Sequence, residues 1–273
     1  MPAKVVKKVA QAATWNAADY AANSTVQQSW ARELIARLKL CGDEHILDVG
    51  CGDGKVTAEI ARAVPRGTVT GVDASTEMLK FAKKMFPRTK IPNLKFKASD
   101  ARVIKFTEKF DIAFSNAALH WVDDHEAFLR GASAALKPGG RLVVSCGGKG
   151  NAHDVFLALR PLMRLKRWRG FFRKMPLPYF FYAPSDYEKW LPRHGFKINA
   201  LNLAPKDATY DGAEGFATWL RTTWLPFVQR VPEAVREEFI AAATERYLAK
   251  HPVDANNKVH VRMVRLEIEA VKL

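Results

Sequence analysis

Short apolar runs and longer runs of helical period alternate along the first half of the chain. The short runs are rich in β-branched residues and predict strands over residues 45–50, 68–73, 94–100, 109–116 and 141–146. Between them the helical period predicts helices over about residues 55–63, 76–85 and 124–137. Five strands that alternate with helices indicate an α/β fold, with a parallel sheet and helices on both of its faces.

The chain on either side of this core follows other patterns. Residues 24–40 carry a helical apolar stripe, and residues 151–183 are helical at first and then aromatic and broken by prolines. A strand over 196–203 and a strand-like end over 259–273 bring the expected sheet to seven strands, doubly wound and mostly parallel. We expect an N-terminal helical segment that covers the active site over residues 1–42, and a ligand-binding core over residues 43–150. A basic aromatic cap insertion is expected over residues 151–183, and a C-terminal part of the core with substrate-binding helices over residues 184–273.

A glycine-rich turn follows the first strand, in "HILDVGCGDGKVTAEIA" over residues 45–61. The dinucleotide fingerprint requires a glycine where Lys55 stands, and a phosphate loop requires Ser or Thr where Val56 stands. Asp48 beside the turn would repel a phosphate, whereas Asp73 ends the second strand, where a carboxylate accepts hydrogen bonds from ribose hydroxyls. These residues favour a ligand with a ribose and a cationic arm but no phosphate.

Five pieces in order, "LDVGCGDG", "GVDAS", "SDAR", "FDIAFSNAALHW" and "LKPGGRLVV", resemble the class I S-adenosylmethionine-dependent methyltransferase family. The resemblance spans roughly residues 43–147 and implies a Rossmann-like fold. It implies S-adenosyl-L-methionine as the cofactor and S-adenosyl-L-homocysteine as its product. The cofactor-binding residues that it implies are Asp48, Gly50, Gly52, Gly54, Asp73, Ala74, Met78, Asp100, Ala101 and Asn116.

The resemblance also implies a role for each of these residues. The glycines let the backbone approach the methionine and ribose, Asp48 lies near the amino group, and Asp73 holds the ribose hydroxyls. Ala74 and Met78 pack around the adenine, Asp100 with Ala101 reads its exocyclic amine, and Asn116 lies under the methionyl group. Taken alone, Asp100 is more typical of a helix cap or turn residue, and Asn116 of a turn former.

The stretch after Asn116 bears on what is methylated. It lacks the prolines that accompany methylation of nucleobase or glutamine amino groups, and no cysteine is placed for cytosine-carbon chemistry. "NAALHW", together with "YFFYAPSDYEKWLPRHGF", "TWLRTTWLPF" and "VHVRMVRLEIEA", resembles the trans-aconitate methyltransferase group, which esterifies small carboxylates. This narrower resemblance implies O-methylation of a small organic acid with one or more carboxylates.

His120 is the candidate catalytic residue, as a general base for a hydroxyl or amine and as an orienting group for a carboxylate. Arg262 and Arg265 lie three apart on a predicted strand and point to opposite faces, so Arg262 pairs better with His260 on the same face. The candidate substrate-binding residues are Tyr20, Trp121, Arg221, Trp224, His260 and Arg262.

Composition adds a formal charge of +15, which favours anionic partners. Between residues 160 and 174 seven positive side chains alternate with apolar ones, a pattern typical of a membrane-docking or RNA-binding face, or of an amphipathic cap helix with its charges in water. We prefer the cap helix and expect a small anionic substrate rather than nucleic acid. Contact with a membrane surface stays open, and the sequence indicates no oligomeric state.

Other bulk features narrow the class of protein. The three cysteines are scattered and fit neither a disulfide framework nor a metal site. No stretch approaches the roughly 20 apolar residues of a membrane span, and the start lacks the apolar middle of a secretion signal, so we expect a cytoplasmic protein. Two other functions stay open: methylation of another small molecule, a membrane lipid or RNA, and binding of S-adenosylmethionine without catalysis.

Overall fold

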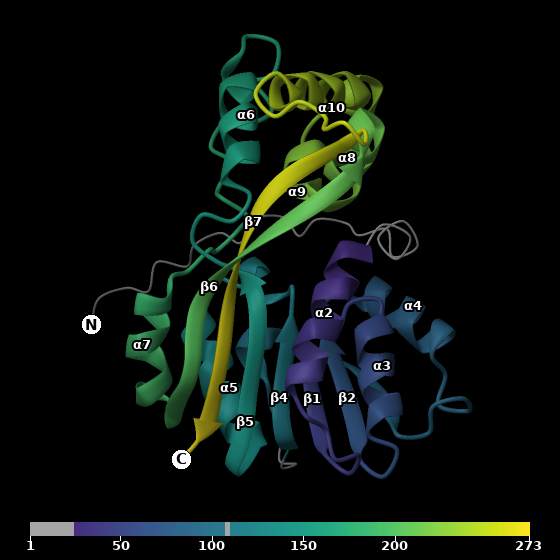
Figure 1. Ribbon diagram of the computed structural model, residues 1–273, viewed down its shortest axis with the longest axis vertical. Coiled ribbons are helices and arrows are strands. Elements are labelled where there is room, and N and C mark those ends of the chain that lie inside the picture. Colours follow the sequence, from purple (N-terminus) through teal and green to yellow (C-terminus); the bar gives the residue numbers. More distant parts are fainter. Residues whose placement is uncertain (1–24, 107–109) are drawn as a thin grey trace. The chain divides into compact units, whose positions relative to one another are not determined.

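The computed structural model describes residues 25–106 and 110–273, so the predicted substrate-binding residue Tyr20 lies outside the described part of the chain (Figure 1). The described residues form two compact units. Residues 154–178 and 210–259 make the helical unit, and the remaining described residues make the sheet unit. Between residues 25 and 273 the described chain therefore passes from one unit to the other four times.

A seven-stranded sheet runs through the sheet unit in the order β3-β2-β1-β4-β5-β7-β6. Neighbouring strands from β3 to β5 are parallel, and β7 is antiparallel to β5. The strands are β1 (His45–Val49), β2 (Thr68–Asp73), β3 (Leu94–Ala98), β4 (Phe110–Asn116), β5 (Leu136–Gly147), β6 (Phe196–Asp211) and β7 (Lys258–Lys272). The last residues of β6 and the first of β7 belong to the helical unit.

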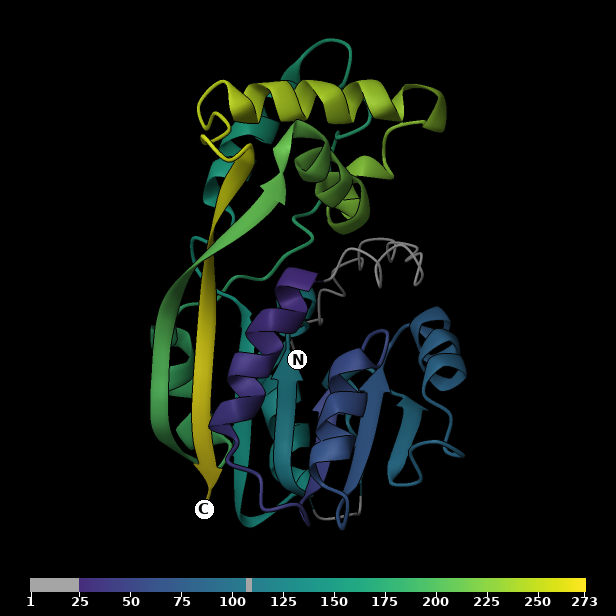
Figure 2. The ribbon, with the colours of Figure 1, turned by 45° about the vertical axis from the view of Figure 1, so that its right-hand side comes forward.

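Helices cover both faces of this sheet, because adjacent residues of a strand point to opposite sides. Ile46 joins a core with Leu34 and Ile60, whereas its neighbour Leu47 joins a core with Phe128 and other residues of the opposite face. Figure 2 shows two helices of the first face in front of the sheet. The first face carries α2 (Thr25–Arg37), α3 (Lys55–Ala63) and α4 (Thr76–Met85), and the second α5 (His125–Ala135) and α7 (Pro184–Arg193). This arrangement confirms the predicted Rossmann-like, doubly wound α/β fold.

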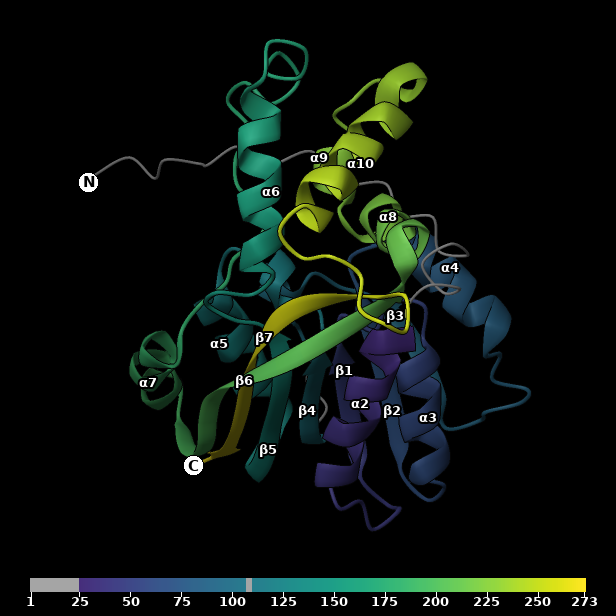
Figure 3. The ribbon, with the colours of Figure 1, turned by 45° about the horizontal axis from the view of Figure 1, so that its top comes forward.

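The helical unit packs its helices around aromatic side chains. Its elements are α6 (His153–Arg164, of which His153 belongs to the sheet unit), α8 (Gly212–Thr223), α9 (Leu225–Val228) and α10 (Glu233–Leu248), labelled in Figure 3. Ring centroids lie 4.9 Å apart for Phe156 and Trp224 and 5.3 Å apart for Trp168 and Phe239. These contacts join residues 210–259 to the insertion, whereas the sequence pattern assigns residues 184–273 to the C-terminal part of the core.

No helix among the described residues is both long and apolar enough to cross a lipid bilayer.

Candidate active site

The glycine-rich turn between β1 and α3 has three glycines in left-handed conformations, with φ of +79° at Gly50, +52° at Gly52 and +80° at Gly54. A Cβ at Gly50 would lie 2.1 Å from the Cβ of Ala118, and one at Gly54 would lie 2.8 Å from the Cβ of Ala82. At Gly52 an added Cβ would meet no atom within 4 Å. Gly50 and Gly54 are therefore needed for close packing, and of the three glycines only Gly52 exposes bare backbone to open space.

Carboxylates surround this turn. Asp73, at the end of β2, accepts hydrogen bonds from the Gly52 N–H at 2.9 Å and the Ser75 N–H at 2.8 Å, and its burial raises the pKa. Asp48 accepts a hydrogen bond from the Thr57 hydroxyl at 2.7 Å. Burial, reinforced by the charge of Asp73, raises the pKa of Asp48 to about 7. Such a cluster favours a cationic ligand over a phosphate.

A third carboxylate, Asp53, lies in the turn itself and is absent from the predicted set. It is 6% exposed, and burial raises its pKa. Its Oδ1 accepts the Lys55 N–H at 3.2 Å, while Oδ2 lies 3.6 Å from the Lys55 Nζ without a hydrogen-bond partner among the described residues. This buried carboxylate next to the open glycine adds negative charge to the turn, which favours a cationic ligand.

The predicted adenine residues follow β2 and β3. Met78 is buried on α4, whereas Ala74 is exposed before that helix. Asp100 caps the short 3₁₀ helix Ala101–Val103 by accepting the Arg102 N–H at 2.8 Å. The Arg102 guanidinium also binds this carboxylate, at 2.6 Å between Nη2 and Oδ2, and lowers its pKa. The helix-cap role of Asp100 is therefore present in the structure.

A buried arginine lies at the carboxyl ends of β4 and β5. Arg265 of β7 is 5% exposed, and its Nη2 donates to Asn116 Oδ1 at 3.1 Å and to the Ser145 carbonyl oxygen at 2.6 Å. Its Nε donates to Ser145 Oγ at 3.1 Å, and the guanidinium lies 5.6 Å from the ring centroid of Trp30 on α2. Arg265, rather than Arg262, therefore lies at the end of β4.

His260 and Arg262 lie on β7 with exposed side chains. His260 pairs with Asp207 of β6 through its Nδ1, at 2.6 Å, and is 47% exposed. The sequence correctly separated the faces of Arg262 and Arg265, but strand alternation alone does not reveal which face meets the end of β4. The pairing of β7 with β5, which sets Arg265 opposite Gly147, decides it.

His120 lies on the 3₁₀ helix Leu119–Trp121, which follows β4, and is surrounded by aromatic rings. The ring centroids of Trp121, Tyr179 and Phe181 lie 5.5, 6.2 and 6.1 Å from that of His120, and Tyr179 stacks on Phe181. The Phe180 N–H donates to the His120 carbonyl at 2.9 Å, which ties this aromatic segment to the sheet unit. His120 and its sequence neighbour Trp121 therefore lie in one aromatic cluster with Tyr179 and Phe181.

The protonation of His120 follows from its contacts. Its Nδ1 accepts the Gly147 N–H at 3.2 Å, so the neutral ring carries its proton on Nε2. Burial, and then the positive charge of Arg265, lower the pKa of His120 to about 3. At neutral pH the ring is therefore uncharged and has a hydrogen-bond donor at Nε2.

A second histidine, His125, holds the 3₁₀ helix Leu119–Trp121 in place through a hydrogen bond. Buried His125 donates from Nε2 to the Leu119 carbonyl at 2.7 Å, so its Nδ1 accepts the hydroxyl proton of Tyr187 on α7. Burial lowers the pKa of His125 to about 4, which keeps it neutral. The position of His120 therefore depends on a hydrogen-bonded chain that reaches α7.

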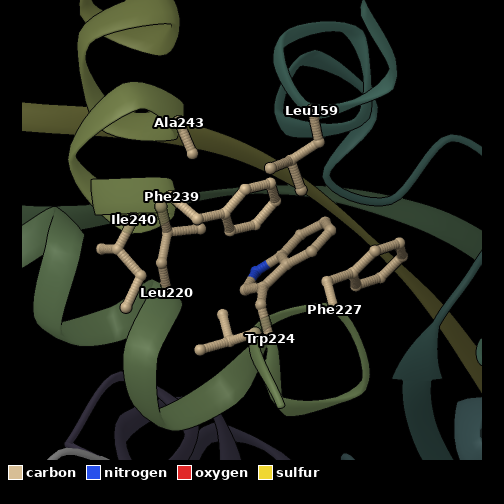
Figure 4. Close-up of a pocket in the computed structure, with 8 residues that line it drawn as sticks. Leu159, Leu220, Trp224, Phe227, Phe239, Ile240 and Ala243 are labelled. Carbon is tan, nitrogen blue, oxygen red and sulfur yellow. The ribbon is translucent and has the colours of Figure 1, made fainter. Parts of the chain in front are cut away.

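Two predicted substrate residues lie in the helical unit. Arg221 forms a bidentate ion pair with Glu237, at 2.9 and 2.6 Å, which raises the pKa of the guanidinium. Trp224 is 3% exposed, and Figure 4 shows it among apolar side chains. Trp224 therefore packs in an apolar core within its own unit.

Comparison with known proteins decides the family. The methyltransferase domain family matches residues 46–140, and an uncharacterized methyltransferase of Schizosaccharomyces pombe, C70.08c, is 32% identical over 80% of this chain and 84% of its own. The chain belongs to the methyltransferase family. The trans-aconitate 2-methyltransferase of Agrobacterium fabrum is 29% identical over 94% of this chain and 99% of its own.

Solved structures agree on the fold of this methyltransferase. The YcgJ protein of Bacillus subtilis has a TM-score of 0.60 at 16% identity, over 90% of this chain and 98% of its own. Phosphoethanolamine N-methyltransferase 2 of Haemonchus contortus, in complex with S-adenosyl-L-methionine, has a TM-score of 0.60 at 18% identity, over 94% of this chain and 56% of its own.

The enzyme is an S-adenosyl-L-methionine-dependent methyltransferase of class I, and the residues of its glycine-rich turn suit that cofactor. The open backbone at Gly52 leaves space for a ligand, and Asp73 ends β2 next to it. The carboxylates of Asp48 and Asp53 complement the positive charges of the cofactor. A Cβ added at Gly52 would occupy this space.

Proposed function

We propose that this enzyme methylates a carboxylate oxygen of a small organic acid, held beside Arg265, Asn116 and His120. The buried guanidinium of Arg265 at the carboxyl ends of β4 and β5 is the observation that carries the proposal. A guanidinium stays charged at every physiological pH and matches a carboxylate in shape. The trans-aconitate 2-methyltransferases among the relatives support the same substrate class.

The state of His120 favours a nucleophile that is already ionised. A general base works best with a pKa near the working pH, whereas the pKa of His120 lies at about 3. Amines and most hydroxyls must lose a proton during methylation, but a carboxylic acid has already lost its own at neutral pH. We therefore assign His120 the role of orienting the acid through its Nε2–H.

The aromatic side chains around His120 exclude water from the reacting groups. The ring centroids of Trp121, Tyr179 and Phe181 lie 5.5, 6.2 and 6.1 Å from that of His120, and the rings of Trp121 and Tyr179 lie 4.7 Å apart. Burial raises the pKa of Tyr179 above its ordinary value, so its hydroxyl stays protonated at neutral pH. In methyl transfer much of the catalysis comes from alignment and desolvation, and these rings supply both.

We assign the cofactor side of the site to the predicted residues of the sheet unit. S-adenosyl-L-methionine supplies an electrophilic methyl group when it is bound. Gly52 and Asp73 hold its ribose side, Asp48 its amino group, and Met78, Ala74, Asp100 and Ala101 its adenine. Asn116 connects the two sides, because its Oδ1 accepts a hydrogen bond from Nη2 of Arg265, which fixes the orientation of the Asn116 amide.

A product assay tests the substrate class. The purified enzyme is incubated with S-adenosyl-L-methionine and a panel of di- and tricarboxylates, fatty acids, phenols and amines, and release of S-adenosyl-L-homocysteine is measured. We expect turnover on carboxylates only, with a methyl ester that mild alkali hydrolyses. Turnover confined to amines or phenols would contradict the proposal.

A pair of arginine variants tests the site. Arg265→Met removes charged hydrogen bonds worth about 1.5–3 kcal/mol, so kcat/KM for the acid falls about 10- to 150-fold, mainly through KM. Arg262→Met removes the same charge from the other face of β7 and changes kcat/KM by less than about threefold. Arg265→Lys keeps the charge and recovers part of the loss. The assignment fails if Arg262→Met carries the loss while Arg265→Met binds cofactor and acid normally.

A further inference from the structure

Residues 157–177 of the helical unit carry exposed positive charges and exposed leucines, and we call the surface of this segment the basic face. Leu157, Leu165 and Leu177 are 45%, 44% and 63% exposed. Seven arginines and lysines and no acidic residue lie between positions 160 and 174. From this combination we propose that the basic face docks the enzyme on an anionic lipid bilayer.

Most of these charges have no counter-charge among the residues that the structure describes. Arg167 pairs with Glu238, and Arg160 lies over the ring of Phe156. The other five, Arg164, Lys166, Arg169, Arg173 and Lys174, are exposed and form no ion pair among the described residues. Unpaired surface cations attract an anionic surface, and their attraction falls as salt is added.

Leu157 is exposed because the inward side of α6 is already filled. Phe156, Leu159 and Leu162 are buried, and Phe156 packs on Trp224 and Phe227 of the same unit. Leu157 lies on the opposite side, in line with exposed Arg160 and Arg164 at the helical spacing of three and seven residues. The helix therefore presents cations and an apolar side chain together on its outer face.

The aromatic residues of this segment favour a bilayer over RNA. Trp168 is 3% exposed and packs against Phe239, and Phe172 packs against the same ring at 5.3 Å. Single-stranded RNA binds to exposed rings on which its bases stack, and these two rings are turned inward. Leucines among cations instead suit the interface of a bilayer, where apolar groups enter the acyl region and cations meet the headgroups.

The test measures vesicle binding by the full-length enzyme. Sedimentation with vesicles of phosphatidylcholine and phosphatidylglycerol is compared with vesicles of phosphatidylcholine alone, at several salt concentrations. We expect binding to the mixed vesicles that weakens steeply with salt, and little binding to the neutral ones. Cofactor binding and urea unfolding of every variant show that both units are folded.

Two kinds of variant separate the charge from the leucines. Arg169→Glu with Arg173→Glu weakens binding to the mixed vesicles by about 30-fold or more and flattens the salt dependence. Leu165→Ala with Leu177→Ala weakens it by about tenfold and leaves the salt dependence unchanged. The matched control, Lys83→Glu with Lys84→Glu on exposed positions of α4, makes the same change in net charge and loses less than about threefold.

Three results would overturn the proposal. The first is no binding of the wild-type enzyme to the mixed vesicles at low salt. The second is an equal loss in the α4 control, which would show a response to net charge alone. The third is tight binding to a single-stranded RNA that the Arg169 and Arg173 variant loses while vesicle binding stays weak, which would assign the face to nucleic acid. None of these depends on which acid the enzyme methylates.

Discussion

Replacing each glycine of the turn by alanine separates folding from cofactor binding. At Gly52 the only expected folding cost is that of an alanine in the left-handed region, about 1–2 kcal/mol, because no atom lies within 4 Å of the new Cβ. That Cβ fills the open space beside the turn, so the Kd for S-adenosyl-L-methionine rises by at least about tenfold, or about 1.4 kcal/mol.

Gly50→Ala gives the opposite profile. Its Cβ would lie 2.1 Å from the Cβ of Ala118, far inside the ordinary contact distance, so overpacking adds about 1–3 kcal/mol to the same backbone cost. We therefore expect the larger loss of stability at Gly50, with a loss of binding that follows from the disturbed turn.

Gly139→Ala is the matched control for Gly52→Ala. Gly139 has φ of +74° and open space around its Cβ position, but it lies near the start of β5, at the opposite edge from the carboxyl ends. Gly139→Ala therefore carries the folding cost of an alanine in the left-handed region without weakening cofactor binding. Isothermal titration with the cofactor and urea unfolding measure the two quantities. If Gly52→Ala binds the cofactor as tightly as Gly139→Ala does, the cofactor does not lie against this backbone and our assignment is wrong.

Two further predictions concern buried polar groups. Because burial raises the pKa of Asp48 from 3.8 to about 7, the native state holds this proton more tightly than the unfolded chain, and this group lowers stability as pH rises from about 4 to about 7. Asp48→Asn removes that loss of stability. Above about pH 7 we therefore expect urea unfolding to show the variant more stable than the wild type, on the order of 4 kcal/mol, and the difference shrinks toward about pH 4. A difference in stability that does not depend on pH would contradict this. Tyr187→Phe leaves Nδ1 of buried His125 without its donor and costs about 1–3 kcal/mol, whereas Tyr182→Phe, whose hydroxyl donates to an exposed carbonyl, costs less than about 1 kcal/mol. Equal unfolding free energies for the two tyrosine variants would show that the His125 contact is unimportant.

Elements with a strong local signal were predicted closely. The predicted helix over 76–85 is α4, and the strand over 68–73 is β2. In both, apolar period and capping residues agree with the tertiary packing. The strand predicted over 196–203 extends in β6 to Asp211, because its later residues pair with β7, and pairing with a strand so distant in sequence leaves no local pattern.

The candidate site was predicted in part for the same reason. The cofactor residues follow one another at the ends of the first four strands, so their order in the sequence indicates their meeting in space. Arg265 meets Asn116 across 149 residues, and Tyr179 and Phe181 reach His120 from a segment that reads as an insertion. These neighbours depend on chain pairing that local periodicity does not encode.

The sequence by itself determined the fold class, the glycine-rich turn and the kind of cofactor, because each depends on residue types at short, regular spacing. Only the tertiary structure decided that Gly52 is the open glycine of the turn and that Arg265 is the arginine at the end of β4. Only it showed that the pKa of His120 falls to about 3. Open space, strand partners and burial are properties of the packed chain, and they arise from contacts between residues far apart in sequence.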